Sequence, residues 1–400
     1  MRLIFLLMLC ILQQTTFGQN KMNVRVTHLP VDHPDQPIYL TGNFNAWNPA
    51  DSALQLKKMG NGVWGVDLVL NDVPSDRVEY KFTRGDWQRS ECSATGNLEA
   101  PRIAMLGQDI EVTCQIAGWR DAFPASTASP QVHLVDSAFY IPQLDRHRPV
   151  WIYLPKDYTT SGRKYPVLYL QDGQHVFDEM TSKGRIGPIE WGVDEVLDVS
   201  ATPCIVVAIN HQESYDDRFP EYFLHANPEY TNVEGEGYLA FISETLKPYI
   251  DSHFRTLPDP ENTGLAGSSM GGLVSLYAGI RYPEVFGLLG IFSPSIWLDH
   301  GHIEKELKTL KKTSKIKNQQ YYFYAGKEEN RRKPDGTFVQ MADDVDRVVA
   351  LLKSGPHPII QQTIHPHGRH GALYWREAFP VFYDWFINQT SITQKDIKNN

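Results

Sequence analysis

The spacing of hydrophobic positions changes about one third of the way along the chain. Between residues 23 and 117, short runs rich in β-branched and aromatic residues alternate with turn clusters such as Asn61-Gly62. This pattern is typical of a small all-β sandwich. The runs are VRVTHL, PIYLTG, GVWGVDLVL, RVEYKFT and DIEVTC. We therefore predict an immunoglobulin-like β-sandwich over residues 20–117.

From about residue 131 onward, strand and helix patterns alternate. Apolar residues recur at helical spacing between the predicted strands, for example at Leu239, Ile242 and Leu246. The predicted strands are YPVLYLQ, PCIVVAIN, NTGLAGS, GLLGIFS, QYYFYAG and PIIQQTI, after an antiparallel opening pair VHLVDSAFY and RPVWIYLP. The alternation predicts an α/β fold over residues 131–390, with a mostly parallel central sheet flanked by helices. The stretch 118–130, rich in small residues and proline, is predicted to be a linker, and 391–400 a tail.

The first residues have the pattern of an export signal. Met1-Arg2 gives a positive start, an apolar run follows over residues 3–12, and small residues precede Gln19. We therefore predict a signal peptide over residues 1–18 and a secreted or periplasmic protein. The apolar run is shorter than the roughly 20 residues that a membrane-spanning helix needs. No membrane span is expected after cleavage.

Composition narrows the classes of function. The hydrophobic share of 42% and charged share of 21% are those of a globular protein. A net charge of −9 without a basic run argues against a nucleic-acid partner. In an oxidising compartment Cys92 and Cys114 could form a disulfide, whereas Cys204 lies in an apolar run and is expected to be a buried thiol. Buried thiols throughout are the alternative.

One motif indicates nucleophilic chemistry. Gly267-Ser268-Ser269-Met270-Gly271 matches G-x-S-x-G between a short apolar strand and a helix start. A nucleophile elbow requires this strand–turn–helix context, because the sharp turn needs small residues beside the serine. The motif predicts that Ser269 is a nucleophile.

A serine nucleophile needs a histidine that accepts its proton. In hydrolases with this elbow the chain order is serine, acid, histidine, so the histidine should follow the last strand. His370 lies there, with His365 and His367 as nearby competitors. The three histidines could also suggest a metal site, but no carboxylate or cysteine accompanies them at ligand spacing. We therefore predict His370 as the general base, with no metal and no cofactor.

The acid should follow the strand QYYFYAG. Glu328 and Glu329 come directly after its end, and we predict Glu329 as the acid, with Glu328, Asp343 and Asp344 as alternatives. The oxyanion hole should use the amide after the nucleophile and one from the loop QDGQHVFD. The predicted donors are the backbone amides of Met270 and Gln174.

With these residues placed, the second domain resembles the esterase D family of α/β-hydrolases, which includes feruloyl and acetylxylan esterases, siderophore esterases related to enterochelin esterase, and S-formylglutathione hydrolase. The resemblance implies the same serine, histidine and oxyanion loop. The family's acid is commonly aspartate, so Glu329 is a departure. The motifs that carry the resemblance are LYLQDGQHVFD, GYLAFISETLKPYIDSHFRT, LAGSSMGGLVSLYAGIRYPEVFG, FSPSIW and GRHGALYWREAFPVFYDWF.

The first domain resembles a starch- or glycogen-binding type of carbohydrate-binding module. The stretches IYLTGNFNAWNP, GVWGVDLVL and YKFTRGDWQRSE carry this resemblance. It implies sugar contacts by Trp47, Lys81 and Trp87. The alternative is a β-sandwich without sugar binding, in which Trp47 packs inward.

These features together predict an exported serine carboxylesterase that acts through an acyl-enzyme. An acetyl or feruloyl ester on a carbohydrate is the predicted substrate, because export and a binding module fit an acylated extracellular glycan. A siderophore trilactone or another small ester is the alternative substrate. A non-catalytic glycan-binding protein on a hydrolase scaffold is the alternative from another class, disfavoured because serine, histidine and a candidate acid are all present.

Overall fold

The computed structural model describes residues 20–391, except for gaps at 32–34, 71–72, 74–76, 97, 108, 183–186, 213–214, 229, 311–318, 333–335 and 356–358. The predicted signal peptide and almost all of the predicted tail lie outside the described residues. Within the described part, none of the helices combines the length and apolarity required to cross a membrane. The chain divides into two compact units, and the main boundary falls between Pro124 and Ala125, inside the predicted linker.

The first unit is all β, as predicted. A four-stranded sheet has the order β3-β4-β1-β8, and a three-stranded sheet has the order β2-β5-β7. Alternate residues of the strands are buried, as in β1, where Met22, Val24 and Val26 are fully buried. The strands are β1 (Asn20–His28), β2 (Tyr39–Gly42), β3 (Lys57–Gly60), β4 (Val63–Leu70), β5 (Arg77–Thr83), β6 (Glu91–Cys92), β7 (Arg102–Met105), β8 (Asp109–Gln115) and β9 (Gly118–Trp119).

The start of the predicted linker is part of this first unit. Strand β9 opens the stretch 118–130 and pairs antiparallel with β6. The described linker is therefore shorter than the sequence indicated.

The suggested disulfide between Cys92 and Cys114 is not present between these described residues. Both side chains are buried thiols, and so is Cys204. Cys114 lies on β8 with its sulfur 3.4 Å from the hydroxyl of Tyr80, whereas Cys92 lies on β6 in a different sheet. The alternative of buried thiols therefore holds.

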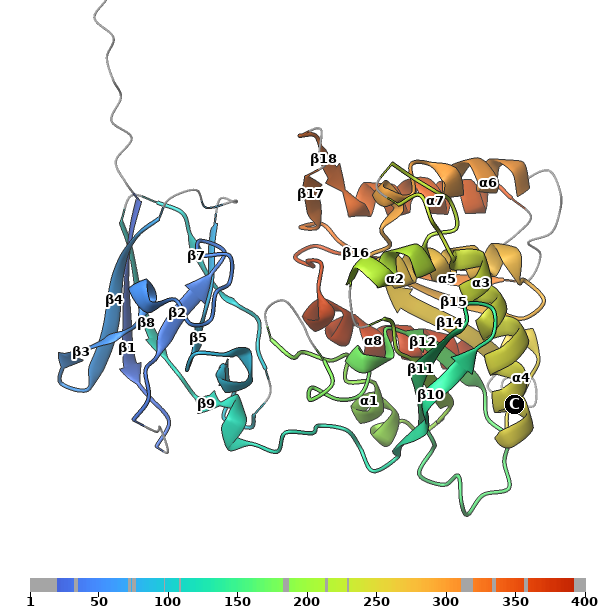
Figure 1. The fold of residues 1–400 in the computed structure, drawn as a ribbon, viewed down its shortest axis with the longest axis horizontal. Coiled ribbons are helices and arrows are strands. Elements are labelled where there is room, and N and C mark those ends of the chain that lie inside the picture. Colours follow the sequence, from blue (N-terminus) through green and yellow to red (C-terminus); the bar gives the residue numbers. More distant parts are fainter. Residues whose placement is uncertain are drawn as a thin grey trace, which may run out of the picture. The chain divides into compact units, whose positions relative to one another are not determined.

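The second unit contains an eight-stranded sheet of order β10-β11-β13-β12-β14-β15-β16-β19 (Figure 1). Strands β10 and β11 are antiparallel to their neighbours, and the pairs from β13 to β19 are parallel. The predicted α/β fold and its antiparallel opening pair are confirmed. The strands are β10 (Val132–Ile141), β11 (Arg146–Tyr153), β12 (Val167–Gln171), β13 (Ile205–Ile209), β14 (Thr263–Ser268), β15 (Leu288–Phe292), β16 (Gln320–Gly326) and β19 (Ile359–His365).

Helices cover both faces of this sheet. Helices α1 and α8 share a core with one set of alternate strand residues, such as Leu168 and Leu170. Helices α2–α7 share a core with the other set, such as Val167 and Tyr169. The helices are α1 (Val193–Val199), α2 (Tyr215–Tyr222), α3 (Gly235–Ala240), α4 (Lys247–His253), α5 (Met270–Arg281), α6 (His302–Leu310), α7 (Met341–Lys353) and α8 (Ala372–Gln389).

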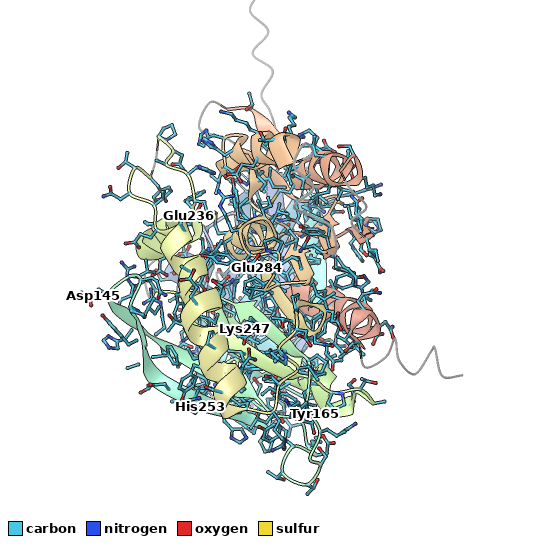
Figure 2. All side chains as sticks on the ribbon, turned by 90° about the vertical axis from the view of Figure 1, so that its right-hand side faces the viewer. Asp145, Tyr165, Glu236, Lys247, His253 and Glu284 are labelled. Carbon is cyan, nitrogen blue, oxygen red and sulfur yellow. The ribbon has the colours of Figure 1, made fainter. Side chains whose placement is uncertain are left out.

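Two local features of the second unit were not predicted. A π-helical segment, η5 (Phe241–Leu246), joins α3 to α4, and Figure 2 shows the three as one continuous run with Glu236 near one end and His253 near the other. A β-hairpin of β17 (Asn330–Arg332) and β18 (Phe338–Gln340) lies between β16 and α7 (Figure 1).

Candidate active site

Ser269 is the single residue between strand β14 and helix α5. Its backbone has φ 57° and ψ −119°, a conformation that strains a residue with a side chain by about 1–3 kcal/mol. A side chain at Gly267 would lie 2.7 Å from the carbonyl oxygen of Gly271, so the turn needs glycine there. The amide of Ser269 donates to the carbonyl of Phe292 at the end of the neighbouring strand β15, at 2.9 Å. The turn thus holds the Ser269 side chain at the carboxyl edge of the sheet.

His370 lies between the end of β19 and the start of α8. Its Nε2 is 3.0 Å from Ser269 Oγ, and its Nδ1 is 3.0 Å from Glu329 Oε2. The ring of Trp375, in the first turn of α8, meets the His370 ring edge-on with centroids 5.0 Å apart. A hydroxyl, an imidazole and a carboxylate in this series can move the hydroxyl proton onto the imidazole.

Glu329 is buried and is held at both carboxyl oxygens. Its Oε2 faces His370, and its Oε1 accepts hydrogen bonds from the Gly326 amide and the Ser293 hydroxyl, each at 2.7 Å. Trp375 donates its indole N–H to the same Ser293 hydroxyl at 3.0 Å. These contacts fix the carboxyl group so that Oε2 faces His370.

The competing candidates have other partners. Glu328 bonds to His367 and Arg369, and Asp344 forms an ion pair with Arg347 on its own helix. Asp343 is exposed on α7. Among the described acids predicted for this role, Glu329 is therefore the one that the structure brings to His370.

The loops that carry Glu329 and His370 are in backbone contact. A side chain at Gly326 would overlap the carbonyl of Gly368. The amide of Glu328 donates to that same carbonyl at 3.1 Å, and the amide of Lys327 donates to the carbonyl of His365 at 2.9 Å. This close approach, possible only with glycine at position 326, fixes the distance between the acid and the histidine.

The environment lowers the pKa of His370 below its ordinary value. Burial is the main cause, because it disfavours the charged imidazolium, and the hydrogen bond to Glu329 opposes it. The positive charges of Arg331 and Arg218 act in the same direction as burial. His370 is therefore a neutral imidazole near pH 7, the form that can accept a proton.

The two predicted oxyanion donors lie on segments that leave the sheet at the same edge. Met270 is the first residue of α5, where an amide has no carbonyl of its own helix to bond. Gln174 follows β12, which is parallel and adjacent to β14. Its side-chain oxygen accepts the amide of His211 at 3.1 Å, and its carbonyl accepts the hydroxyl of Thr181 at 2.8 Å. These bonds fix the loop, and the oxyanion role of both amides stays a prediction.

An ion pair between Asp172 and Arg218 holds the start of this loop. Asp172 has a left-handed backbone (φ 58°) and accepts two hydrogen bonds from Arg218, both at 2.7 Å. Burial alone would raise the pKa of Asp172, but Arg218 outweighs it and lowers the pKa to about 2. Arg218 is thus bound to a structural carboxylate at the start of the loop that carries Gln174.

The residues predicted to bind sugar do not form the exposed platform that the resemblance implied. Lys81 is 1% exposed and its ammonium donates to the carbonyl of Glu99 at 2.7 Å. Trp47 is 9% exposed and packs 6.3 Å from the half-buried ring of Trp87, between centroids. Both side chains pack inside the first unit, as the alternative without sugar binding expects for Trp47, and sugar contacts by Trp47, Lys81 and Trp87 stay predictions.

A group of carboxyls that the sequence did not single out lies at the start of α1. Glu190, Asp194 and Glu195 bring one oxygen each to within 4.8 Å of one another. Arg376 pairs with Glu190, and the amide of Ser129 donates to Asp194 at 2.6 Å. Burial and neighbouring carboxylates raise the pKa values of Glu190 and Asp194 to about 8.

Sequence reasoning also missed the side chains that support the triad. Ser293 and Ser295 belong to the FSPSIW stretch and Trp375 to the GRHGALYWREAFPVFYDWF stretch, and both stretches entered only as carriers of the family resemblance. FSPSIW begins at the last residue of strand β15, which is the neighbour of the strand before Ser269. The two serines directly after this strand, at the edge of the sheet that carries Ser269, were the signal in the sequence that could have pointed to these supporting side chains.

Most of the second unit matches the model of a known protein family. Residues 141–385 match the model of the esterase family described as "Putative esterase". The chain belongs to this family. Among its relatives, the uncharacterized protein YbbA of Bacillus subtilis is 26% identical over 190 residues, 47% of this chain and 71% of that protein. The endo-1,4-beta-xylanase/feruloyl esterase of Xylanibacter ruminicola is 29% identical over 154 residues, 37% of this chain and 19% of that protein.

A solved structure extends the likeness in fold. The enterobactin esterase FES of Shigella flexneri matches with a TM-score of 0.53 and 18% identity, over 88% of each chain. At this identity the likeness concerns the fold. The family thus rests on the match in sequence, and the solved structure supports the α/β architecture.

Proposed function

We propose that this member of the esterase family is a serine carboxylic-ester hydrolase with Ser269 as nucleophile, His370 as general base and Glu329 as the orienting acid. The observation that carries the proposal is the unbroken line of two 3.0 Å contacts from Ser269 Oγ through His370 to Glu329. The complete series also favours an enzyme over a glycan-binding protein on an inactive scaffold.

The first half-reaction forms an acyl-enzyme. Ser269 Oγ bonds to the ester carbonyl carbon as its proton passes to His370 Nε2, and the carbonyl π electrons move onto oxygen. The amides of Met270 and Gln174 are the proposed donors to this oxyanion. When the carbonyl re-forms, the bond to the alcohol oxygen breaks, and that oxygen takes the proton from His370.

The second half-reaction restores the enzyme. Water loses a proton to His370 Nε2 as its oxygen bonds to the acyl carbon. Collapse breaks the bond to Ser269 Oγ, which recovers the proton from His370 and leaves the free carboxylic acid. Glu329 keeps its charge throughout and stabilises the imidazolium. This scheme uses neither a metal ion nor a cofactor.

The proposed substrate is an acetyl or feruloyl ester on a carbohydrate outside the cytoplasm. The predicted signal peptide supports an exported enzyme, and the relative from Xylanibacter ruminicola is named as a feruloyl esterase. A siderophore ester is the second candidate, favoured by the match to the enterobactin esterase over 88% of both chains. Both candidates use the same chemistry at Ser269.

The test compares wild type, Ser269→Ala and the control Ser243→Ala on four esters: p-nitrophenyl acetate, methyl ferulate, acetylated xylan and iron-loaded enterobactin. Ser243 is a suitable control because its buried hydroxyl bonds to the Leu239 carbonyl of its own helical run, at 2.8 Å. We expect Ser269→Ala to lose several orders of magnitude in kcat/KM and Ser243→Ala to retain activity.

The outcomes separate the parts of the proposal. Activity on methyl ferulate or acetylated xylan well above that on enterobactin supports the carbohydrate ester, and the reverse supports the siderophore. Equal hydrolysis by wild type and Ser269→Ala would remove Ser269 from the mechanism. A wild type inert on all four esters would contradict the esterase proposal.

A further inference from the structure

A second serine hydroxyl contacts the nucleophile. Ser295 Oγ lies 3.0 Å from Ser269 Oγ, and the Ser295 amide donates to the Ser269 carbonyl, also at 3.0 Å. Ser295 is 3% exposed. Its hydroxyl and its amide are therefore both directed at the same residue.

The direction of the hydroxyl bond follows from the rest of the series. Carboxylate Glu329 accepts the N–H on His370 Nδ1, so in the neutral imidazole Nε2 carries a lone pair. Ser269 then gives its single proton to Nε2. Because that proton is already in use, the bond between the two hydroxyls needs Ser295 as donor and Ser269 as acceptor.

The turn that carries Ser295 is rigidly placed. Ser293 has a left-handed backbone (φ 42°), and its amide donates to the carbonyl of Tyr324 at 2.7 Å. The Ser295 carbonyl accepts the amide of Leu298 at 3.1 Å. The same turn reaches the acid through the Ser293 hydroxyl. One short segment, Ser293-Pro294-Ser295, thus contacts both ends of the triad.

We propose that Ser295 is a further catalytic residue that donates a hydrogen bond to Ser269 Oγ whenever that oxygen carries negative charge. This inference rests on the proposed function. Charge develops on Oγ as its proton moves to His370 in acylation, and again as Oγ leaves the acyl carbon in deacylation. A hydrogen bond to a charged oxygen is stronger than one to a neutral oxygen. The bond from Ser295 therefore stabilises both transition states more than it stabilises the resting enzyme. Ser295 keeps its own proton throughout.

The test measures Ser295→Ala in the full-length protein against wild type and Ser243→Ala. The two readouts are the rate of covalent labelling of Ser269 by a fluorophosphonate and the steady-state hydrolysis of p-nitrophenyl acetate. We expect both the labelling rate and kcat to fall about tenfold, equivalent to about 1.4 kcal/mol, with KM within about twofold of wild type. The pH midpoint of the acidic limb, which reports His370, should stay unchanged.

A nearly isosteric variant keeps the test decisive if Ser295→Ala misfolds. Ser295→Cys keeps the shape of the side chain but offers only a weak donor, so we expect a loss of similar direction and smaller size. Circular dichroism and melting temperature establish that each variant is folded. If Ser295→Ala does not fold, the cysteine variant decides.

Each other outcome overturns the proposal. Wild-type rates in Ser295→Cys and Ser295→Ala would show that the contact has no role. A faster variant would show that Ser295 competes with His370 for the Ser269 proton. A raised KM together with a shifted acidic limb would indicate that the substitution moved the active-site residues, instead of removing one hydrogen bond. A wild type that fails to label refutes the activated nucleophile, and with it both proposals, whereas normal labelling in Ser295→Ala refutes this one alone.

Discussion

The indole N–H of Trp375 donates to the hydroxyl of Ser293 at 3.0 Å, and that hydroxyl in turn donates to Glu329. The same indole packs edge-on against His370. Trp375 therefore acts on the histidine directly through its ring and on the acid through Ser293. The side chains of Trp375, Ser293, Glu329 and His370 therefore form a closed ring of contacts. The imidazole is held in this ring from two sides.

This ring of contacts predicts the effect of Trp375→Phe. Phenylalanine keeps a ring against His370 but removes the indole N–H, which leaves a buried lone pair of Ser293 without its donor and costs about 1 kcal/mol. We expect a several-fold lower kcat with little change in KM and a slightly lower melting temperature. Trp385→Phe is the matched control, because Trp385 is equally buried in α8 and contacts Tyr322 and Phe382. Equal loss in both variants would contradict a role for the indole N–H.

Glu329 should tolerate neither loss of charge nor shortening. Glu329→Gln removes the charge that stabilises the imidazolium, and we expect kcat/KM to fall by about three to four orders of magnitude. Glu329→Asp keeps the charge but is one methylene too short to serve both Gly326 and His370, so a smaller loss is expected. Esterase assays of both variants check this, with Glu328→Gln as control. Full activity in Glu329→Gln would exclude it as the acid.

The lowered pKa of His370 sets the acidic limb of activity. Since only the neutral imidazole accepts the serine proton, kcat/KM should be constant near pH 7 and fall as pH drops through the His370 pKa, below the ordinary value of 6.5. Removing Glu329, which raises this pKa, should move the limb to still lower pH. A pH profile of wild type and Glu329→Gln tests both statements. A midpoint above 6.5 in wild type would contradict the burial argument.

The carboxyl group at α1 predicts how stability depends on pH. The pKa values of Glu190 and Asp194, about 8 in the folded protein, lie above their ordinary values of 4.5 and 3.8. Between these limits the folded state binds more protons than the unfolded state. The contribution to stability is therefore complete at about pH 4 and is lost as pH rises to about 8.

Urea unfolding of Asp194→Asn tests this dependence. The amide is neutral at every pH, so the decline in unfolding free energy between pH 5 and 8 should be smaller than in wild type. Asp343→Asn is the control, since Asp343 is exposed. An unchanged slope in Asp194→Asn would show that the protons are bound elsewhere.

Because Lys81 and Trp47 are buried, we expect that binding of the protein to insoluble polysaccharides does not depend on them. Lys81→Met preserves the length of the side chain and removes a desolvated charge, so binding to insoluble xylan and starch should equal that of wild type. Its unfolding free energy should be no lower, because burial disfavours the charged ammonium more than the nearby carboxylates of Glu91 and Glu99 favour it, and so lowers the pKa of Lys81. Sedimentation assays with these polysaccharides measure retention. Weaker retention in Lys81→Met would support its predicted role.

Hydrophobic periodicity was enough to predict the sheet of the second unit, because all its parallel strands except the edge strand β19 are almost wholly buried. It did not predict β3, whose residues are exposed, or β9, which is two residues long. The chain order of the elbow, strand ends and last helix gave Ser269, Glu329 and His370. Ser293 and Ser295 act through contacts across neighbouring strands, and such contacts leave no periodic signal in one sequence.

The hairpin β17–β18 begins directly after Glu329 and ends directly before α7. Its base is closed by the amide of Met341, which donates to the Glu329 carbonyl at 3.2 Å. Near its far end, Phe338 is 73% exposed. The bond at the base joins the residue that carries the carboxylate directly to the first residue of α7. The acid is therefore anchored on one side by the end of strand β16, through the Gly326 amide, and on the other by the start of a helix.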